Sequence, residues 1–376
     1  MKKFFILAAA AVVATAACTK SEVVEAPEKA ISFEVAKYAT ATKAASYNSL
    51  LDETANGAAV TNFYTNAWFH TTGYSAQQTM ADQSIVPNDA TNPTQWNTDG
   101  RTYYWPKTGY LNFFSYAGYP LPTAKAEGSV TYSGVTVDRN ANILVADAAY
   151  GYKENTTNAN PPYQQNSVTK GVPTLFHHML SRVKFDVIFD ASAITDASYA
   201  YTVTIKTASI SVPQVGTLAV NFTEPANVAT TPQVVALSTP GWSSLGSYAA
   251  IDKVSGDVVL TAKGGNKSDG STTDGTATGT PVELITESSA ISHALSDDVT
   301  FSMTYTFSYK YGSEAPVTED VTITATKLKE FAPSVSTWAM NTKYLYHIII
   351  KPNEPIIFDP AVETWVAETN EPEYTY

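Results

Sequence analysis

Residues 299–311 read VTFSMTYTFSYKY, and apolar side chains alternate with polar ones along the whole stretch. Because successive side chains of a β-strand point to opposite faces of a sheet, this alternation predicts a strand with one buried face. At about 3.3 Å per residue such a strand spans roughly 40 Å, much more than the usual five or six residues. The stretch therefore predicts an elongated sheet.

Shorter segments repeat the pattern. Apolar residues alternate with polar ones over residues 183–189, 201–212 and 344–350. In the second of these the phase slips by one residue around Lys206 and Thr207, which predicts a β-bulge. No segment after the N-terminal apolar run has sustained helical spacing, and only 15% of residues are charged. The sequence predicts an all-β protein.

The N-terminus has the features of an export signal. Lys2 and Lys3 precede an apolar run over residues 4–17, which is typical of a secretory signal peptide. The run is shorter than the roughly 20 apolar residues that a membrane-spanning helix needs. We therefore expect residues 1–17 to be removed on export.

Cys18 is the single cysteine of the 376 residues and directly follows Thr15, Ala16 and Ala17. This position resembles the site at which bacterial lipoproteins are cut and acylated, although Thr15 stands where leucine is usual. We expect an acylated Cys18 to hold the chain at the outer membrane, with residues 18–29 as a linker, because two acyl chains suffice for stable anchorage. The alternative is that Cys18 is simply the last residue of an ordinary signal peptide.

Charge and motifs exclude several classes of function. The net charge of −12 makes nucleic acid an unfavourable partner, because phosphate binding needs clustered Lys and Arg. The sequence contains no G-x-S-x-G, P-loop or H-E-x-x-H motif. Its histidines are not at metal-ligand spacing. We therefore expect neither an enzyme, nor a cofactor, nor a metal site. The histidines are His70, His177, His178, His293 and His347.

The length predicts two domains rather than one. A segment rich in Asn, Pro and Gln at residues 154–170 predicts the boundary near residue 170. This gives an N-terminal domain of residues 30–170 and a C-terminal domain of residues 171–376. Within the second domain, the Gly- and Ser-rich residues 264–280 are interpreted as a flexible loop.

Five segments in this order resemble the fimbrillin family of type V pili from Gram-negative bacteria, and the resemblance covers nearly the whole chain. The resemblance implies two transthyretin-like β-sandwich domains in tandem. It also implies a structural subunit of a fimbrium that supports adhesion at the cell surface. Its partners would be identical or different pilus subunits, with a host or bacterial surface ligand as a further partner. The segments are residues 30–46, 101–106, 111–120, 175–187 and 356–365.

The resemblance further implies that a trypsin-like protease removes an N-terminal strand. The removable strand would span residues 31–38, where Ile31, Phe33 and Val35 share one face. Lys43 is the best-placed cleavage site. Arginine is commoner there in the family, whereas the first arginine of this chain is Arg101. The alternative is that Lys43 is an ordinary loop residue.

A neighbouring subunit would then fill the vacated place with a strand from its C-terminal residues 351–376. Phe358, Val362 and Trp365 are the side chains expected to insert. Prolines divide this tail into short extended pieces, since proline lacks an amide donor. The same composition fits the last strand of the chain's own C-terminal domain, so donation and self-completion both stay open.

One further function stays open, and so does the role of the chain within a pilus. Six Trp and 23 Tyr residues are compatible with a glycan-binding surface lipoprotein, because sugar rings stack on aromatic faces. However, Trp96, Trp105, Trp338 and Trp365 lie in patterned or apolar stretches, where core packing is the commoner role. Within the pilus interpretation the chain could be a shaft, anchor or tip subunit.

Overall fold

A computed structural model of the chain describes part of its residues. The described residues are 30–37, 61–89, 95–136, 142–153, 164–165, 171–222, 236–237, 243–253, 258–263, 267–269, 279–281, 283–286, 293–294, 297–340 and 342–364. Over these residues the structure is built almost entirely of β-strands, which confirms the predicted all-β class.

The strands before residue 180 are β1 (Ser32–Lys37), β2 (Phe63–His70), β3 (Gln77–Pro87), β4 (Trp96–Thr98), β5 (Tyr110–Tyr119), β6 (Ala124–Ala126), β7 (Ser129–Thr136), β8 (Asn142–Ala146), β9 (Ala149–Lys153), β10 (Gln164–Gln165) and β11 (Val172–His178). Those that follow, up to residue 270, are β12 (Ser181–Asp190), β13 (Tyr199–Asn221), β14 (Ala236–Leu237), β15 (Ser243–Ala249), β16 (Ile251–Lys253), β17 (Val258–Lys263) and β18 (Lys267–Asp269). The remaining elements are β19 (Gly279–Pro281), β20 (Glu283–Thr286), β21 (His293–Ala294), β22 (Thr300–Tyr311), β23 (Val317–Lys327), α1 (Leu328–Phe331), β24 (Thr337–Trp338), β25 (Thr342–Ile350) and β26 (Ile357–Thr364).

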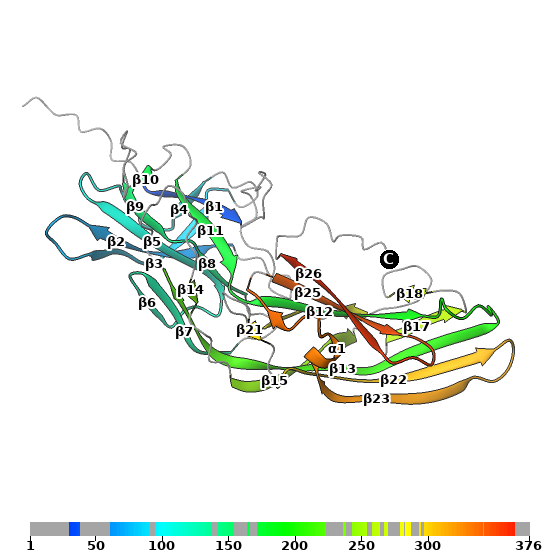
Figure 1. The fold of residues 1–376 in the computed structure, drawn as a ribbon. Coiled ribbons are helices and arrows are strands. Elements are labelled where there is room, and N and C mark those ends of the chain that lie inside the picture. The colour runs from blue at the N-terminus through cyan, green and yellow to red at the C-terminus, as the bar shows by residue number, and fades with distance from the viewer. Residues whose placement is uncertain are drawn as a thin grey trace, which may run out of the picture.

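The first large sheet closes on itself. Its strand order is β10-β9-β5-β2-β3-β4-β1-β11-β8, and β8 also pairs with β5. The strands β5, β2, β3, β4, β1, β11 and β8 therefore form a ring, and one cluster of buried side chains from all of them fills its interior. We call this nine-stranded sheet and the clusters packed on it the N-terminal lobe (Figure 1).

The 23-residue strand β13 belongs to an eight-stranded sheet that contacts the N-terminal lobe through its last part. Its first part pairs with the long hairpin strand β22, and its last part pairs with β7. Leu218 and Val220, near its end, pack with Tyr116 on the outer side of the ring. In Figure 1 the β22–β23 hairpin lies at the end of the molecule far from the ring.

The second core lies between this eight-stranded sheet and the sheet β18-β12-β25-β26. Phe185 of β12 packs against Phe301 of β22 and Tyr346 of β25, with ring centroids 5.5 and 5.2 Å apart. Inward-facing residues of β12, β13, β22 and β25 fill the core because their apolar side chains recur with the period of a strand. We call this part the C-terminal lobe.

The strand predictions agree with the structure in detail. The alternation at residues 299–311 is β22, whose odd-numbered residues from Phe301 to Tyr305 are buried. The predicted bulge is confirmed, because the register of β13 against β22 shifts between Ile205 and Thr207. Within the predicted loop of residues 264–280, the structure describes β18, which pairs with β12, and the start of β19.

The predicted boundary near residue 170 and the two tandem transthyretin-like sandwiches stay predictions. The pairing of β11 bears on the boundary, because β11 lies in the ring with β1 and β8 although it follows residue 170. A division drawn from strand pairing would therefore come after His178. Among the described residues, no helix is long and apolar enough to cross a membrane.

Candidate functional site

Strand β1 closes the ring of the N-terminal lobe. On one side, residues 33–37 pair in parallel with residues 172–176 of β11. On the other side, Ser32 and Phe33 pair antiparallel with Asn97 and Trp96 of the short strand β4. Removal of β1 would therefore open the ring between β4 and β11 and leave the facing backbone groups of β11 unpaired.

The inner face of β1 is fully inserted in the core. Ile31, Phe33 and Val35 are 3%, 0% and 3% exposed, as the alternation of this segment predicts. The ring of Phe33 meets those of Phe63 and Phe113 edge-on, at centroid distances of 5.7 and 5.6 Å. We call the surface that receives this face the β1 seat; it is formed by Phe63, Trp96, Trp105, Phe113, Val172 and Phe176.

Gly171 lies where the backbone of β1 passes closest to β11. Its φ of +97° is a conformation that glycine adopts without strain. A Cβ atom at this position would lie 2.6 Å from the carbonyl oxygen of Ser32 and 2.8 Å from the nitrogen of Phe33. The absence of a side chain at Gly171 therefore allows the backbone of β1 to come close to the start of β11. This holds whatever side chains β1 carries.

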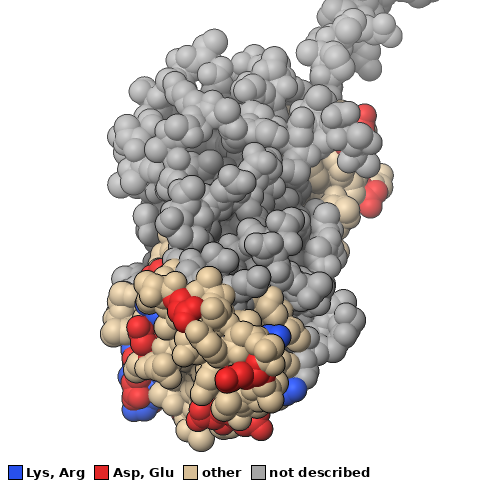
Figure 2. All heavy atoms as spheres, turned by 90° about the vertical axis from the view of Figure 1, so that its right-hand side faces the viewer, with Lys and Arg blue, Asp and Glu red and all other residues tan. Residues whose placement is uncertain are grey.

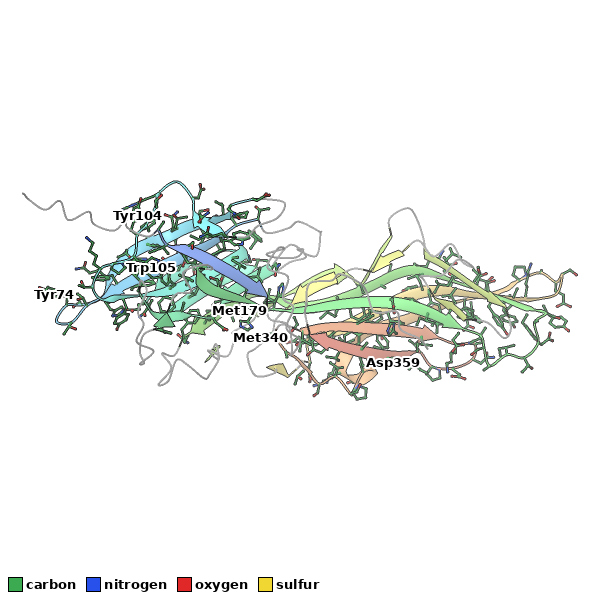
Figure 3. The ribbon with its side chains drawn as sticks, turned by 90° about the horizontal axis from the view of Figure 1, so that it is seen from above. Tyr74, Tyr104, Trp105, Met179, Met340 and Asp359 are labelled. Carbon is green, nitrogen blue, oxygen red and sulfur yellow. The ribbon has the colours of Figure 1, made fainter. Side chains whose placement is uncertain are left out.

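The N-terminal end of β1 is held by the segment before β5. Ala30 forms an antiparallel bridge with Tyr104, and the amide N–H of Ile31 donates to the carbonyl oxygen of Tyr103 at 2.8 Å. The next residue, Trp105, is 3% exposed. Its ring packs against that of Phe113 at a centroid distance of 5.9 Å, and Phe113 in turn contacts Phe33. In Figure 3 Tyr104 and Trp105 are labelled in the N-terminal lobe.

Strand β26, which contains the predicted donor residues, completes the chain's own sheet. It pairs antiparallel with β25 and lies at the edge of that sheet. Phe358 is buried against Phe301 and Phe331, at centroid distances of 5.1 and 4.5 Å. Val362 is 53% exposed, although it lies opposite the core residue Tyr344. Figure 3 labels Asp359, which is exposed on this strand.

Pro360 stands in the middle of β26, opposite Tyr346. Because proline has no N–H, it is tolerated in edge strands and weakens the pairing of a further strand. The position of Pro360 is thus typical of a strand that ends a sheet.

Three residues predicted to act in export and assembly lie outside the described residues. They are Cys18, Lys43 and Trp365. Lipidation at Cys18, cleavage at Lys43 and insertion of Trp365 therefore stay predictions.

Polar clusters of the N-terminal lobe have structural partners. Asp82, at φ +47° in β3, accepts hydrogen bonds from Asn66 and Tyr116 and pairs with Lys125. Burial raises the pKa of Asp82, but the hydrogen bonds from Lys125, Asn66 and Tyr116 outweigh it, so the pKa lies below its ordinary value. These contacts join β2, β3, β5 and β6 at one point on the outside of the ring.

The histidines that the structure describes in detail contact polar or acidic side chains; His70, for example, contacts Glu127 and Asn112. His177 lies 3.0 Å from Asp147, and the Nδ1 atom of His347 lies 2.7 Å from Asp186. No group of three metal-ligating side chains occurs among the described residues. On the face drawn in Figure 2, described Lys and Arg side chains are scattered among Asp and Glu rather than gathered into one surface.

The tryptophans that the structure describes lie in the cores. Trp96, Trp105 and Trp338 are 3%, 3% and 1% exposed. The more exposed aromatic residues are tyrosines, among them Tyr74, Tyr104 and Tyr311. The described tryptophans therefore offer no stacking surface to a sugar.

Sequence reasoning found the inner face of β1 but missed the residues that hold it. Gly171 and Trp105 carried signals that were available: a glycine directly before an apolar strand, and a tryptophan in a Tyr-Tyr-Trp run. Neither signal says which strand the residue contacts, because both contacts are with a segment distant in sequence.

Comparison with known proteins shows that this chain is similar to some of them in structure but not in sequence. No family model matches the chain, and no curated protein matches it. The chain is similar to a fimbrial protein from Bacteroides vulgatus, with 14% identity, a TM-score of 0.49, and coverage of 90% of this chain and 99% of that one. It is also similar to a protein from Bacteroides uniformis provisionally assigned to cell adhesion, with 16% identity, a TM-score of 0.41, and coverage of 90% and 98%.

A fimbrial anchor protein from Porphyromonas gingivalis is similar at 10% identity and a TM-score of 0.32, with coverage of 90% of this chain and 98% of that one. These fimbrial and adhesion proteins are of the class that the sequence resembles. At such identities and TM-scores they assign no function to this chain, so the function is argued from the strand geometry.

Proposed function

We propose that this chain is a structural subunit of a surface pilus and that it polymerises by exchanging β1 for a strand of a neighbouring subunit. The observation that supports the proposal is the place of β1 in the ring. This strand closes the sheet and fills its interior, yet on the β4 side it is paired through only two residues, Ser32 and Phe33. A sheet that loses one strand favours pairing with a strand of another chain.

The free energy of the exchange supports a durable polymer. Burial of Ile31, Phe33 and Val35 contributes about 5 to 9 kcal/mol, at about 1.5 to 3 kcal/mol for each side chain. Loss of β1 without replacement would cost about this amount. A replacement strand with a similar inner face restores the burial, and its release from the finished polymer is then equally unfavourable.

Maturation would begin with export as a lipoprotein. Cys18 would hold the chain at the outer membrane, and cleavage after Lys43 would separate β1 from the chain that follows. Before the cut, β1 stays at high local concentration because it is covalently attached. After the cut, an incoming strand competes with a separate segment, so proteolysis makes the exchange favourable.

The C-terminal residues 351–376 are the proposed source of the donated strand. In the structure Phe358 lies in the chain's own core, so donation of β26 would require this strand to leave its sheet. Its edge position makes departure less costly than for an internal strand. Self-completion by β26, with donation by the residues beyond Thr364, is the alternative.

Limited proteolysis tests the proposal. Trypsin treatment of the folded protein should give Ala44 as a new N-terminus, followed by ladders of polymer on a gel run without denaturant. Lys43→Gln is the matched control, because it removes the site and should leave the chain monomeric. A chain cut at Lys43 that keeps its fold and stays monomeric would count against strand exchange.

Pilus subunits of this kind would support adhesion at the cell surface. The roles of shaft, anchor and tip differ in whether a subunit donates a strand, accepts one or does both. In the ladder experiment a shaft subunit should form long series, whereas an anchor or tip subunit should stop at short ones.

A further inference from the structure

A lysine, an aspartate and a buried asparagine meet on the outside of the ring. Asn66 of β2 is 2% exposed, and its side-chain nitrogen donates to the Oδ1 atom of Asp82 at 3.0 Å. The Nζ atom of Lys125, on β6, lies 2.9 Å from the other carboxylate oxygen of Asp82. One carboxylate therefore holds a primary amine and a side-chain amide. An amine and an amide can form a new amide bond when ammonia leaves.

The orientation of the Asn66 amide is fixed by a backbone group. The backbone N–H of Asp82 donates to Oδ1 of Asn66 at 3.1 Å, and Nε2 of Gln78 donates to the same oxygen at 2.9 Å. Because a backbone N–H can only donate, the atom of Asn66 that faces it is the oxygen. Two donors on Oδ1 stabilise the negative charge that develops there when a nucleophile adds to the amide carbon.

The backbone places Asp82 in this position through an irregular conformation. Asp82 has a φ of +47°, which is uncommon for a residue other than glycine. Opposite the single residue Asn66, β3 has two residues, Ala81 and Asp82, so β3 carries a β-bulge at this point. Bulges and positive φ angles occur often at functional sites, because they direct a side chain where a regular strand would not.

We propose that Lys125 and Asn66 form an isopeptide cross-link, and that Asp82 carries the proton in this reaction. The neutral amine of Lys125 adds to the amide carbon of Asn66, and Oδ1 takes the negative charge. The carboxylate of Asp82 accepts the proton of the bonded nitrogen and passes it to Nδ2. The bond from the amide carbon to Nδ2 then breaks and ammonia leaves. One lysine ammonium and one asparagine amide thus give one amide and one ammonium ion, without an oxidant or a cofactor.

The order of the proton transfers follows from the environment of Asp82. Burial raises the pKa of Asp82, but the hydrogen bonds from Lys125, Asn66 and Tyr116 lower it below its ordinary value. The carboxylate is therefore too weak a base for a free lysine ammonium, whereas the nitrogen of the adduct is strongly acidic. Lys125 must first lose its proton to solvent, so the reaction is expected to be faster at higher pH.

The amine must also move from the carboxylate to the amide carbon. Attack requires a separation of about 3 to 3.5 Å between the reacting atoms. The four-carbon stem of lysine is flexible, and its amine can turn from one partner to the next. Asn66 is held in place by its hydrogen bonds to Asp82 and Gln78, so Lys125 is the group that moves.

The cross-link would join two sheets covalently. Lys125 lies in the β6–β7 hairpin, which belongs to the sheet of β13, whereas Asn66 lies in the ring. Strand β13 pairs with β7 here and with β22 in the C-terminal lobe. A covalent bond at this point would keep the ring attached to β13 when the subunit is pulled. It does not depend on the strand exchange proposed above.

The mass of the full chain tests the cross-link. The protein is kept at about pH 9, where a larger fraction of lysine is neutral, and its mass is compared with that calculated from the sequence. The loss of one ammonia is expected, with a proteolytic fragment that joins Asn66 to Lys125. Lys125→Arg keeps a cation beside Asp82 and Asp82→Asn keeps a residue that tolerates positive φ, yet both should retain the full mass.

Unfolding in urea separates a cross-link from an ion pair. The unfolding constant of Lys125→Arg should be on the order of a hundredfold larger than that of the unchanged chain, because a covalent link that closes a long loop restricts the unfolded state. Full mass in the unchanged chain after incubation would overturn the proposal. Conversion of Asn66 to aspartate would overturn it as well, since water rather than lysine would then have added. A link from Lys125 to Gln78 would also overturn it.

Discussion

The two strands nearest the ends of the described chain, β1 and β26, have similar sequences but different surroundings. On one face of β1 the apolar residues Phe33 and Val35 are two residues apart in the chain, and on one face of β26 the apolar residues Phe358 and Val362 are four apart. The inner side chains of β1 are at most 3% exposed, because β1 has a partner on both edges and lies against the interior of a closed sheet. On β26, Phe358 is 5% exposed and Val362 is 53% exposed, because the strand ends its sheet. The comparison teaches that position in the sheet, rather than composition, sets how deeply the side chains of a strand are buried.

The largest expected effect comes from truncating the central side chain of each strand. Phe33→Ala should lower the free energy of unfolding of its lobe by about 3 to 5 kcal/mol, because it leaves a cavity between Phe63 and Phe113. Phe358→Ala should cost less, about 2 kcal/mol, since the edge of a sheet relaxes more easily. Both losses are measured by unfolding each variant in urea and following hydrogen exchange separately in each lobe. Equal losses would show that edge position does not matter here.

Gly171→Ala tests the approach of β11 to β1 with no change in β1 itself. A cost of about 1 to 3 kcal/mol is expected, from strain at positive φ together with the collision with Ser32. Gly73→Ala is the matched control, because Gly73 has a φ of +85° but nothing within 4 Å of the added Cβ.

The difference between these two glycine variants isolates the contact with β1. Gly171→Ala should also release β1 faster, which trypsin cleavage near Lys43 would report as a higher rate. If both variants lose the same stability and are cut at the same rate, Gly171 does not determine how β1 binds.

The smallest effect is expected at the exposed end of β26. Val362→Ser should change the free energy of unfolding by no more than about 0.5 kcal/mol, as is usual for surface positions. The same substitution at Val35 should cost about 2 kcal/mol or more, because it buries a hydroxyl group inside the ring. Thermal unfolding of both variants makes the comparison, and a large loss at Val362 would mean that this end of β26 is covered in solution.

Local patterns predicted the strands and their buried faces well. The alternation that gave β22, the slip at Lys206 that gave the bulge in β13, and the inner face of Ile31, Phe33 and Val35 all follow from the period of two in a strand. The loop predicted at residues 264–280 contains the short strand β18, because Gly and Ser favour turns but do not exclude short strands.

The candidate site was predictable only in part. The sequence identified which residues of β1 are buried, but Gly171 and Trp105 gained their roles from contacts across more than 70 residues of chain. The strand predicted as a donor presents the reverse case. Phe358 and Val362 lie on a strand and Trp365 lies outside the described residues, whereas the place of β26 at the edge of the second sheet depends on β25.

The sequence by itself determined that this protein is built of strands and which side chains of each strand turn inward. Both follow from the local geometry of an extended chain, in which neighbouring side chains point to opposite faces. The tertiary structure decided which strands pair, that β1 closes a ring beside β11 while β26 ends a sheet, and that the indole of Trp105 has no acceptor among the described residues. Strand pairing depends on backbone N–H and C=O groups, which nearly every residue carries. The alternation of side chains along one strand therefore does not say which other strand it pairs with.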